Sequence, residues 1–212
     1  MNGFVRVCSD MSTDSFILSP PSVLEPLAVE RLFARKAPLE VDLGCGKGRF
    51  LAQRAATHPE INFLGIDRLK ARLRKVDSKL RMRGLVNVRL LRLEASYSIR
   101  YLLPPRSVST FYVFFPDPWP KRKHHRRRLF GTSFLDDLDG SLSEGGRIHV
   151  ATDHLDYFRA IRGLLTADPR FEETDPFVPT EEEQTDFERI FRARNLPIGR
   201  CSFVKRVGVG RD

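Results

Sequence analysis

Four acidic residues each stand at the end of a short apolar segment, where their types and spacing can bind a cationic ligand. They are Asp42 in LEVDL, Asp67 in NFLGID, Glu94 in LLRLEA and Asp117 in YVFFPD. In a parallel sheet the carboxyl ends of the strands share one edge, so these carboxylates are predicted to converge there. Singly, each also fits a structural role, as a turn residue, a helix start or the partner of a backbone amide. Together they predict a binding site.

A glycine-rich segment, VDLGCGKG at residues 41–48, ends the first of these strands. Gly44, Gly46 and Gly48 allow a tight turn and close approach of a ligand to the backbone. In a dinucleotide fingerprint the third glycine would fall where this chain has Arg49, and the spacing also differs from that of a P-loop. The loop therefore predicts a ligand without a pyrophosphate group.

S-adenosylmethionine is such a ligand, and its chemistry explains why carboxylates surround the loop. Its ammonium and sulfonium groups are cationic, its ribose offers two hydroxyl donors and its adenine offers an amino donor. By position, Asp42 is predicted near the methionine end, Asp67 at the ribose hydroxyls and Glu94 near the adenine. The acids and the glycine loop thus predict a methyl-donor site.

The stretch FFPDPWPKRKHHRRR, residues 114–128, joins one of these acids to a run of cations. The apolar start is typical of a central strand, and the prolines stiffen the turn that carries Asp117 and Trp119. Trp119 is interpreted as a packing residue, with stacking on a base as the alternative. RNA contact is predicted for Lys121, Arg122, Lys123, His124, His125, Arg126, Arg127 and Arg128. The alternative is a solvated loop. No metal site is predicted at the two histidines, because their neighbours are cations.

Strand-like and helix-like segments alternate along the chain and must position these residues. This alternation predicts an α/β fold with a parallel, doubly wound sheet. The expected strands are residues 39–43, 61–66, 87–93, 108–115, 147–152 and about 200–207, and the expected helices are 49–57, 68–83, 97–102, 128–141 and 154–166. From residue 171 we expect an acidic, proline-containing loop before the last strand. Helix 68–83 has one apolar stripe, so its Lys and Arg side chains face water.

The net charge of +9 over 212 residues is concentrated in two segments. Residues 121–128 contain six Lys or Arg and no acid, and residues 68–83 contain eight against Asp77 alone. Two basic patches indicate a surface for a polyanion such as a nucleic acid, the alternative being a solvated helix face and a mobile loop. We expect one domain over residues 31–212 and a weakly ordered N-terminal arm over residues 1–30.

The three cysteines, Cys8, Cys45 and Cys201, are widely spaced and form no C-x-x-C pair, which favours a reducing cytoplasm. The N-terminus lacks the apolar run of a signal peptide, and no stretch approaches the about 18 apolar residues of a membrane span. We therefore expect a cytoplasmic protein without a membrane partner, and no feature requires an obligatory protein partner.

The segment FFPDPWPKRKHHRRRL, with ATD at 151–153 and TDFE at 185–188, closely resembles the tRNA (guanine-N7)-methyltransferases of the bacterial TrmB type. The resemblance runs from about Leu32 to Arg206. It implies a Rossmann-like class I methyltransferase fold with a seven-stranded, mostly parallel sheet. It also implies transfer of a methyl group from S-adenosylmethionine to N7 of guanosine 46 in the variable loop of tRNA.

The resemblance also assigns residues. Asp117 matches the catalytic position. The cofactor-contacting acids of the family match Asp42, Asp67, Glu94 and Asp117, and its substrate-contacting positions match Lys121, Asp153, Thr185, Asp186, Phe187 and Glu188. The family usually has Lys where this chain has Asp186, which reverses the charge there. It usually has the other acid at the first three cofactor positions, which keeps the charge.

Two of the substrate motifs also fit helix starts. Asp153 has the form of a helix N-cap. Thr185 and Glu188 fit a capping box that opens FERIFRAR. Both roles can hold together with substrate contact.

Guanine N7 has a free lone pair and no proton to lose, so the transfer needs no general base. Orientation is therefore expected to dominate the rate. A carboxylate such as Asp117 can accept hydrogen bonds from guanine N1 and N2 and offset the positive charge that grows on the ring.

The alternative functions are methylation of another RNA base and a catalytically inactive RNA-binding module. The order Asp-Pro-Trp-Pro disfavours a base-amino methyltransferase, and Arg49 disfavours a dehydrogenase.

Overall fold

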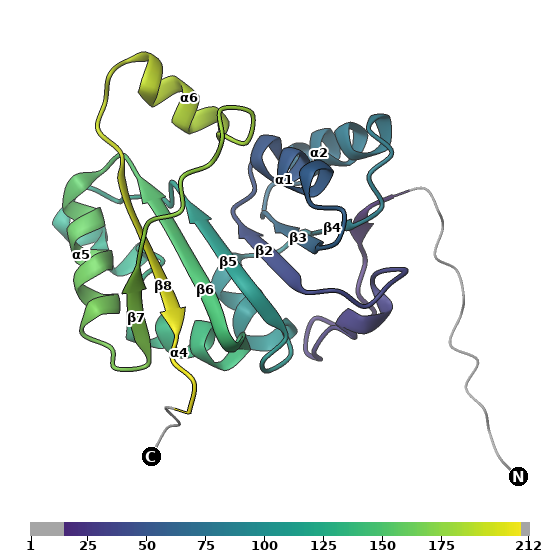
Figure 1. The fold of residues 1–212 in the computed structure, drawn as a ribbon, viewed down its shortest axis with the longest axis horizontal. Coiled ribbons are helices and arrows are strands. Elements are labelled where there is room, and N and C mark those ends of the chain that lie inside the picture. The colour runs from purple at the N-terminus through teal and green to yellow at the C-terminus, as the bar shows by residue number, and fades with distance from the viewer. Residues whose placement is uncertain (1–14, 209–212) are drawn as a thin grey trace, which may run out of the picture.

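Eight strands form one mostly parallel sheet in the computed structural model, which describes residues 15–208 (Figure 1). The strand order is β1-β4-β3-β2-β5-β6-β8-β7, and among these strands only β8 is reversed. The predicted α/β doubly wound fold is therefore confirmed. The strands are β1 Ile17–Leu18, β2 Leu39–Leu43, β3 Asn62–Ile66, β4 Val88–Leu91, β5 Val108–Phe114, β6 Leu142–Thr152, β7 Phe171–Thr174 and β8 Gly199–Lys205.

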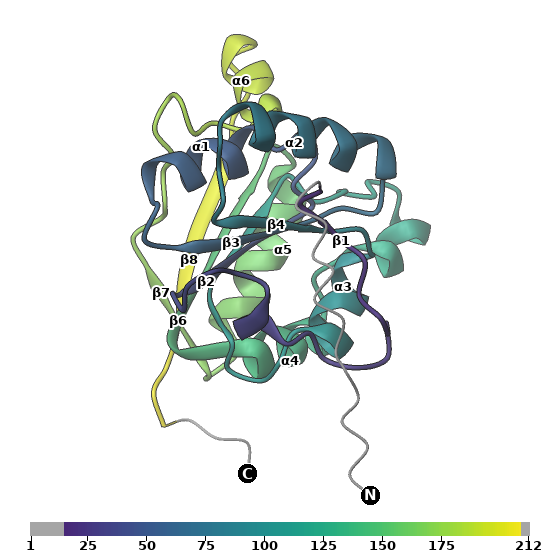
Figure 2. The same cartoon turned by 90° about the vertical axis from the view of Figure 1, so that its right-hand side faces the viewer.

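Helices cover both faces of the sheet, as the edge-on view in Figure 2 shows. Side chains alternate along a strand, so Phe63 of β3 packs with the cluster under α1 and α2, while Leu64 and Ile66 join the cluster on the other face. The helical segments are η1 Val29–Arg31, α1 Arg49–Thr57, α2 Lys70–Met82, α3 Ala95–Tyr97, η2 Ser98–Leu102, η3 Arg122–Arg127, α4 Thr132–Ser141, α5 Leu155–Thr166 and α6 Asp186–Ala193. Within residues 15–208, no helix has the length and apolar character needed to cross a membrane.

The order of the central strands decides where the site lies. The strands β4, β3, β2 and β5 are neighbours and all run in the same direction. Asp42 of β2 lies opposite Gly65 of β3 and Tyr112 of β5 in the parallel register. The segments that follow these strands therefore leave the sheet side by side at one edge.

The N-terminal segment differs from the predicted arm between residues 15 and 30. β1 pairs in parallel with β4, and the Phe16 amide donates to Asp77 Oδ1 over 2.6 Å. Further along, Leu27 is buried and its amide donates to the Leu102 carbonyl over 2.8 Å. This edge strand makes the sheet eight-stranded instead of seven-stranded. Residues 1–14, the rest of the predicted arm, lie outside the described residues.

The segment after α5 also differs from the expected loop. β7 pairs antiparallel with β8, with Phe171 opposite Lys205. The side chain of Phe171 is buried in the core. The strand went unpredicted because its two central residues are exposed glutamates, Glu172 and Glu173, which give no apolar pattern.

Candidate functional site

A cavity of about 670 Å³ opens at the carboxyl ends of β2, β3, β4 and β5. The predicted convergence of four carboxylates is confirmed, because all four line this one cavity. Of the predicted site residues, the cavity is lined by Asp42, Gly44, Gly46, Gly48, Asp67, Glu94, Asp117, Arg126, Arg127, Arg128, Thr185, Asp186 and Phe187. Asp153, Glu188 and residues 121–125 do not line it.

Asp42 and Asp67 are both buried acids that line the cavity. Asp42 is 5% exposed, and no hydrogen bond joins its carboxylate to another described residue. Burial, and secondly the neighbouring Asp67, raise the pKa of Asp42 to about 7. A buried carboxylate without a protein partner is costly, so this side chain is suited to a cationic ligand.

Asp67 and Glu94 each stabilise the local backbone and also line the cavity. The Oδ1 atom of Asp67 accepts from the Leu69 amide over 2.7 Å, and its Oδ2 atom accepts from the Gly46 amide over 3.2 Å. Glu94 is the N-cap of α3, where its Oε2 atom accepts from the Tyr97 amide over 2.8 Å. The turn and helix-start interpretations are thus confirmed for these two acids. Arg72 Nη1 also donates to Asp67 Oδ2, over 3.4 Å. Each oxygen of a carboxylate has two acceptor sites, so Asp67 keeps one site on Oδ1 and Glu94 keeps its Oε1 atom.

The glycine loop links β2 to α1 and has left-handed backbone at three positions. Gly44, Gly46 and Gly48 have φ values of 80°, 56° and 65°. A Cβ atom on Gly44 or Gly46 would meet no side chain within 4 Å, so both lie against open space at the cavity. A Cβ atom on Gly48 would lie 2.6 Å from Cγ1 of Val76. Gly48 therefore serves the contact between α1 and α2, in addition to lining the cavity.

Alanine at Gly48 is expected to lower the free energy of unfolding by about 2 to 4 kcal/mol, because it adds a clash with buried Val76 to left-handed backbone strain. Gly84 is a matched control: its φ is 62°, but its Cβ would meet nothing within 4 Å. Gly84→Ala should lower stability by only about 1 kcal/mol. Urea unfolding measures both variants, and equal losses would show that the contact with Val76 does not matter.

The turn after β5 holds Asp117 out toward the cavity. Asp117 is exposed, and it stands between Phe115 with φ 53° and Trp119 with φ 42°. Left-handed backbone at two non-glycine residues persists only where surrounding contacts enforce it, and such strain clusters at functional sites. One such contact is a hydrogen bond from Arg128 Nε to the Pro118 carbonyl over 2.8 Å.

The basic run forms a short 3-10 helix, η3, instead of an irregular loop. Only its last part, Arg126 and Arg127 with the following Arg128, lines the cavity. The Arg127 guanidinium lies over the Trp119 ring at 5.0 Å from the centroid. Trp119 is half-buried and also lines the cavity, so its role as a packing or base-stacking residue stays a prediction. The Nε2 atom of His125 is buried, which removes that atom from contact with RNA. Lys121, Arg122 and Lys123 are exposed beyond the rim.

Residues 36–198 match the family described as "Putative methyltransferase". The tRNA (guanine-N(7)-)-methyltransferase of Alkalilimnicola ehrlichii is 37% identical over 82% of this chain and 76% of the relative. The enzyme of that name from Halorhodospira halophila is 40% identical over 76% of this chain and 72% of the relative. The chain belongs to the tRNA (guanine-N(7)-)-methyltransferase family.

The fold of this family member is also similar to solved methyltransferase structures. The 16S rRNA methyltransferase KamB superimposes with a TM-score of 0.62, at 18% identity, over 85% of this chain and 94% of KamB. At this identity the likeness shows the fold alone. The class I methyltransferase fold is therefore confirmed.

Asp153 and Thr185 stand at the starts of two helices in this family member. The N-cap of α5 is His154, one residue later than predicted, and its Nδ1 atom accepts from the Tyr157 amide over 3.2 Å. Asp153 is half-buried at the end of β6 and has no capping role. Thr185 does cap α6, since its Oγ1 atom accepts from the Glu188 amide over 3.0 Å.

Glu188 does not complete the capping box, because its side chain points into the protein. It is 1% exposed and forms ion pairs with Arg192 of α6, over 2.9 Å, and with Arg200 of β8. These ion pairs make Glu188 an anchor for α6, and its predicted contact with substrate stays a prediction. The rest of α6 projects beyond the sheet (Figure 1).

Glutamine at Glu188 is expected to lower the free energy of unfolding by about 3 kcal/mol, because Arg200 would keep its buried charge without its acidic partner. The exposed Glu182 in the preceding segment provides the control, and Glu182→Gln should change stability by less than about 0.5 kcal/mol. Urea denaturation tests the pair. Equal stability of Glu188→Gln and wild type would rule out the anchoring role.

Sequence reasoning missed the buried cluster that fixes the segment leading into α6. Phe177 stacks on Phe114 with ring centroids 6.2 Å apart, and the Arg54 guanidinium lies over Phe177 at 5.3 Å. Arg54 also pairs with buried Glu183 over 3.3 Å. The available signal was Phe177 itself, an aromatic residue in an otherwise polar segment. This cluster holds Thr185 and Asp186 at the rim of the cavity.

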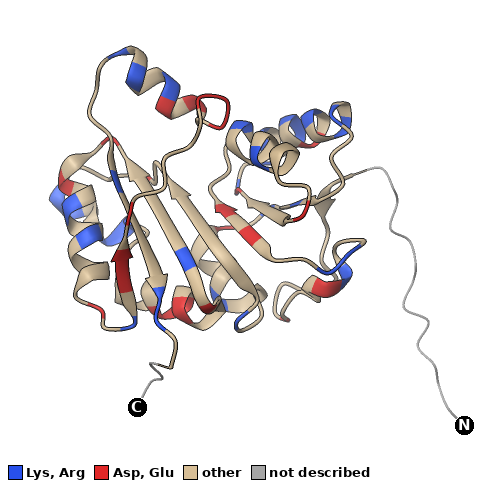
Figure 3. Ribbon diagram, in the orientation of Figure 1, with Lys and Arg blue, Asp and Glu red and all other residues tan. Residues whose placement is uncertain are grey.

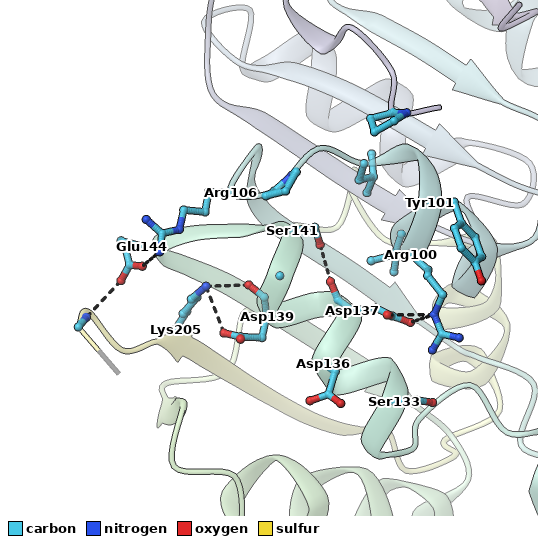
Figure 4. Close-up of a pocket in the computed structure, with 16 residues that line it drawn as sticks. Arg100, Tyr101, Arg106, Ser133, Asp136, Asp137, Asp139, Ser141, Glu144 and Lys205 are labelled. Atoms are coloured by element: carbon cyan, nitrogen blue, oxygen red, sulfur yellow. Dashed lines mark hydrogen bonds and ion pairs between the residues drawn. The ribbon is translucent and has the colours of Figure 1, made fainter. Parts of the chain in front are cut away.

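A second cavity, of about 890 Å³, lies at the opposite edge of the sheet, where β5 and β6 begin (Figure 4). Its charged side chains satisfy one another. Lys205 pairs with Asp139 over 3.1 Å, and Arg100 pairs with Asp137 over 3.1 Å. Compensated charges of this kind leave little to attract a charged ligand, and we assign no ligand to this cavity.

Proposed function

We propose that this protein transfers a methyl group from S-adenosylmethionine to N7 of guanosine 46 in the variable loop of tRNA. The observation that carries the proposal is the meeting of four acidic strand ends in one cavity, beside a strained turn and a run of arginines. The names of the curated relatives supply the base and the RNA. The cytoplasm is the expected compartment, and Cys45 and Cys201 are both free thiols.

The residues that line the cavity fit S-adenosylmethionine. Asp42 has no protein partner and suits the cationic methionine end. Asp67 keeps one acceptor site, on Oδ1, for a ribose hydroxyl, and Glu94 has its Oε1 atom left for the adenine amino group. The open space at Gly44 and Gly46 leaves room for a ligand against the backbone. The bound cofactor would supply an electrophilic methyl group.

The remaining lining residues fit a guanine and its backbone. Asp117 is exposed on a fixed turn and can accept from N1 and N2 of guanine, while Arg126, Arg127 and Arg128 neutralise phosphates beside it. Since N7 needs no deprotonation, the protein has only to align the base and to stabilise the positive charge that the ring gains. Lys121, Asp153, Asp186 and Phe187 remain candidates for further substrate contact.

The direct test is incubation with methyl-labelled S-adenosylmethionine and unmodified tRNA, followed by chemical cleavage at 7-methylguanosine. We expect label on the tRNA and cleavage at position 46 alone. A tRNA with adenosine at position 46 is the matched control and should accept no label. Label on another base or on protein would overturn the proposal, and binding of tRNA without any label would favour an inactive RNA-binding module.

A further inference from the structure

The helix α2 carries a row of cations along one flank. Arg72, Lys75, Lys79 and Arg83 follow one another at spacings of three and four residues, so they lie on one side of the helix. Figure 3 shows the concentration of Lys and Arg on α2. Leu73, Val76 and Leu80 form the buried stripe beside this row. Because this stripe packs against the core, the helix cannot rotate, and the row of cations stays on one side of it.

Contacts to neighbouring elements show which way the flank faces. Arg83 Nη1 donates to Gln53 Oε1 of α1 over 3.2 Å. Lys79 Nζ donates to the carbonyl of Lys47, in the glycine loop, over 2.9 Å. At the other end of the row, Arg72 lines the methyl-donor cavity. The row thus starts at the cavity rim and runs away from it along α2.

Three of the four cations of this row are not paired with an acid among the described residues. Arg72 pairs with Asp67 over 3.4 Å, but within residues 15–208 neither Lys75, Lys79 nor Arg83 forms an ion pair with a carboxylate. Burial lowers the pKa of Lys79; nearby Asp186 opposes this, and the like charges of Arg83, Arg49 and Lys47 add to it. Cations packed this closely produce a positive potential that an anionic partner would relieve.

The row begins at the cavity mouth that Arg126, Arg127 and Arg128 also line, because Arg72 lines the same cavity. Lys47 of the glycine loop and Arg49, the first residue of α1, line the mouth near α2, and Arg126, Arg127 and Arg128 line it from the segment after β5. Successive members of the row are separated by a rise of about 4.5 to 6 Å along the helix axis, so the row offers a series of charges to an extended polyanion. A small anionic ligand would use only one or two of them.

We propose that Lys75, Lys79 and Arg83 form a second docking surface for the tRNA backbone, which holds the RNA on the side of the cavity away from η3. This inference rests on the proposed function, because it takes tRNA as the polyanion. Contacts on two sides of the mouth fix the direction in which the RNA crosses it. The variable loop is then presented to the cavity in one orientation.

The test is tRNA binding by the double variant Lys75→Gln/Arg83→Gln, measured as a function of salt concentration. The matched control is Lys70→Gln/Arg74→Gln, which removes the same charge from exposed positions on the other flank of α2. Each lost phosphate contact should reduce the slope of log affinity against log salt by about 0.7 to 0.9. We expect a slope reduced by roughly 1.5 and a Kd raised about tenfold at 0.1 M salt for the first variant, with the control near wild type.

The measurements also separate this inference from the proposed function. Cofactor affinity should stay unchanged in both variants, and the single variant Lys75→Gln should show about half of the change in slope. Equal losses in the two double variants would mean that only net charge matters, and an unchanged slope in Lys75→Gln/Arg83→Gln would overturn the docking surface. If wild type binds tRNA but leaves N7 unmethylated, the proposed function fails and the result for the row still stands.

Discussion

Alanine or asparagine at Asp117 is expected to lower kcat for tRNA methylation by about 100- to 1000-fold, which is typical for loss of one charged group that stabilises developing charge. The guanine ring becomes cationic as N7 gains the methyl group, and Asp117 is the carboxylate that the turn after β5 holds at the cavity. Asparagine keeps the size and one acceptor but removes the charge. If Asp117→Asn lowers kcat nearly as much as Asp117→Ala does, most of the effect comes from the loss of charge.

Single-turnover rates with saturating tRNA and cofactor measure this effect, because they separate chemistry from binding. Cofactor affinity is measured in parallel, since Asp117 also lines the donor cavity. Asp156 of α5 is the control: it is exposed and pairs with Arg159, so Asp156→Asn should leave the rate unchanged. Near wild-type methyl transfer in Asp117→Ala, with intact cofactor binding, would refute the catalytic role.

The position of Asp117 illustrates what the sequence can predict. The apolar run FYVFF and the prolines predicted a buried strand followed by a stiff turn, and both are present. The left-handed backbone at Phe115 and Trp119 was not predictable, because nothing in the residue types favours it. That conformation is imposed by tertiary contacts such as the Phe115 amide to the Ala151 carbonyl, over 2.7 Å.

The parts that sequence reasoning missed share a physical cause. β1 is only two residues long, and the two central residues of β7 are exposed glutamates. Neither strand therefore has an alternating apolar sequence pattern, and each forms only because a neighbouring strand pairs with it. Glu188 fits a capping box by sequence, yet Arg200 from β8 draws its side chain inward. Partners that are distant in the sequence leave no pattern in the residues around each element, so they cannot be predicted locally. By contrast, the four acids were predictable because strand order and direction alone bring parallel strand ends together.

Asparagine at Asp42 is expected to weaken binding of S-adenosylmethionine and to remove its pH dependence. The pKa of Asp42 is raised to about 7 by burial and by Asp67, so the carboxyl group is mostly neutral at pH 6 and mostly ionised at pH 8. Only the ionised form attracts a cation. Cofactor affinity of wild type should therefore rise about tenfold between pH 6 and pH 8, as the ionised fraction does.

Asp42→Asn is expected to weaken cofactor binding but to stabilise the ligand-free protein. A carboxyl group with a pKa raised above its ordinary value of 3.8 binds more protons when folded than when unfolded. Its ionisation therefore lowers the stability of the folded state as pH rises from about 4 to 7, and the full loss is present above pH 7. Asp42→Asn should raise the free energy of unfolding at pH 8 by up to about 4 kcal/mol.

Glu40 is the matched control, since it lies two residues earlier in β2 and burial also raises its pKa. It accepts a hydrogen bond from the Tyr112 hydroxyl over 2.7 Å and does not line the cavity. Glu40→Gln should leave the pH profile of cofactor binding as in wild type. Calorimetric titration at several pH values and urea unfolding at pH 8 measure the two effects. A variant Asp42→Asn that binds cofactor as wild type does at pH 8 would show that this carboxylate does not face the cation, because its ionised charge would then contribute nothing to the affinity.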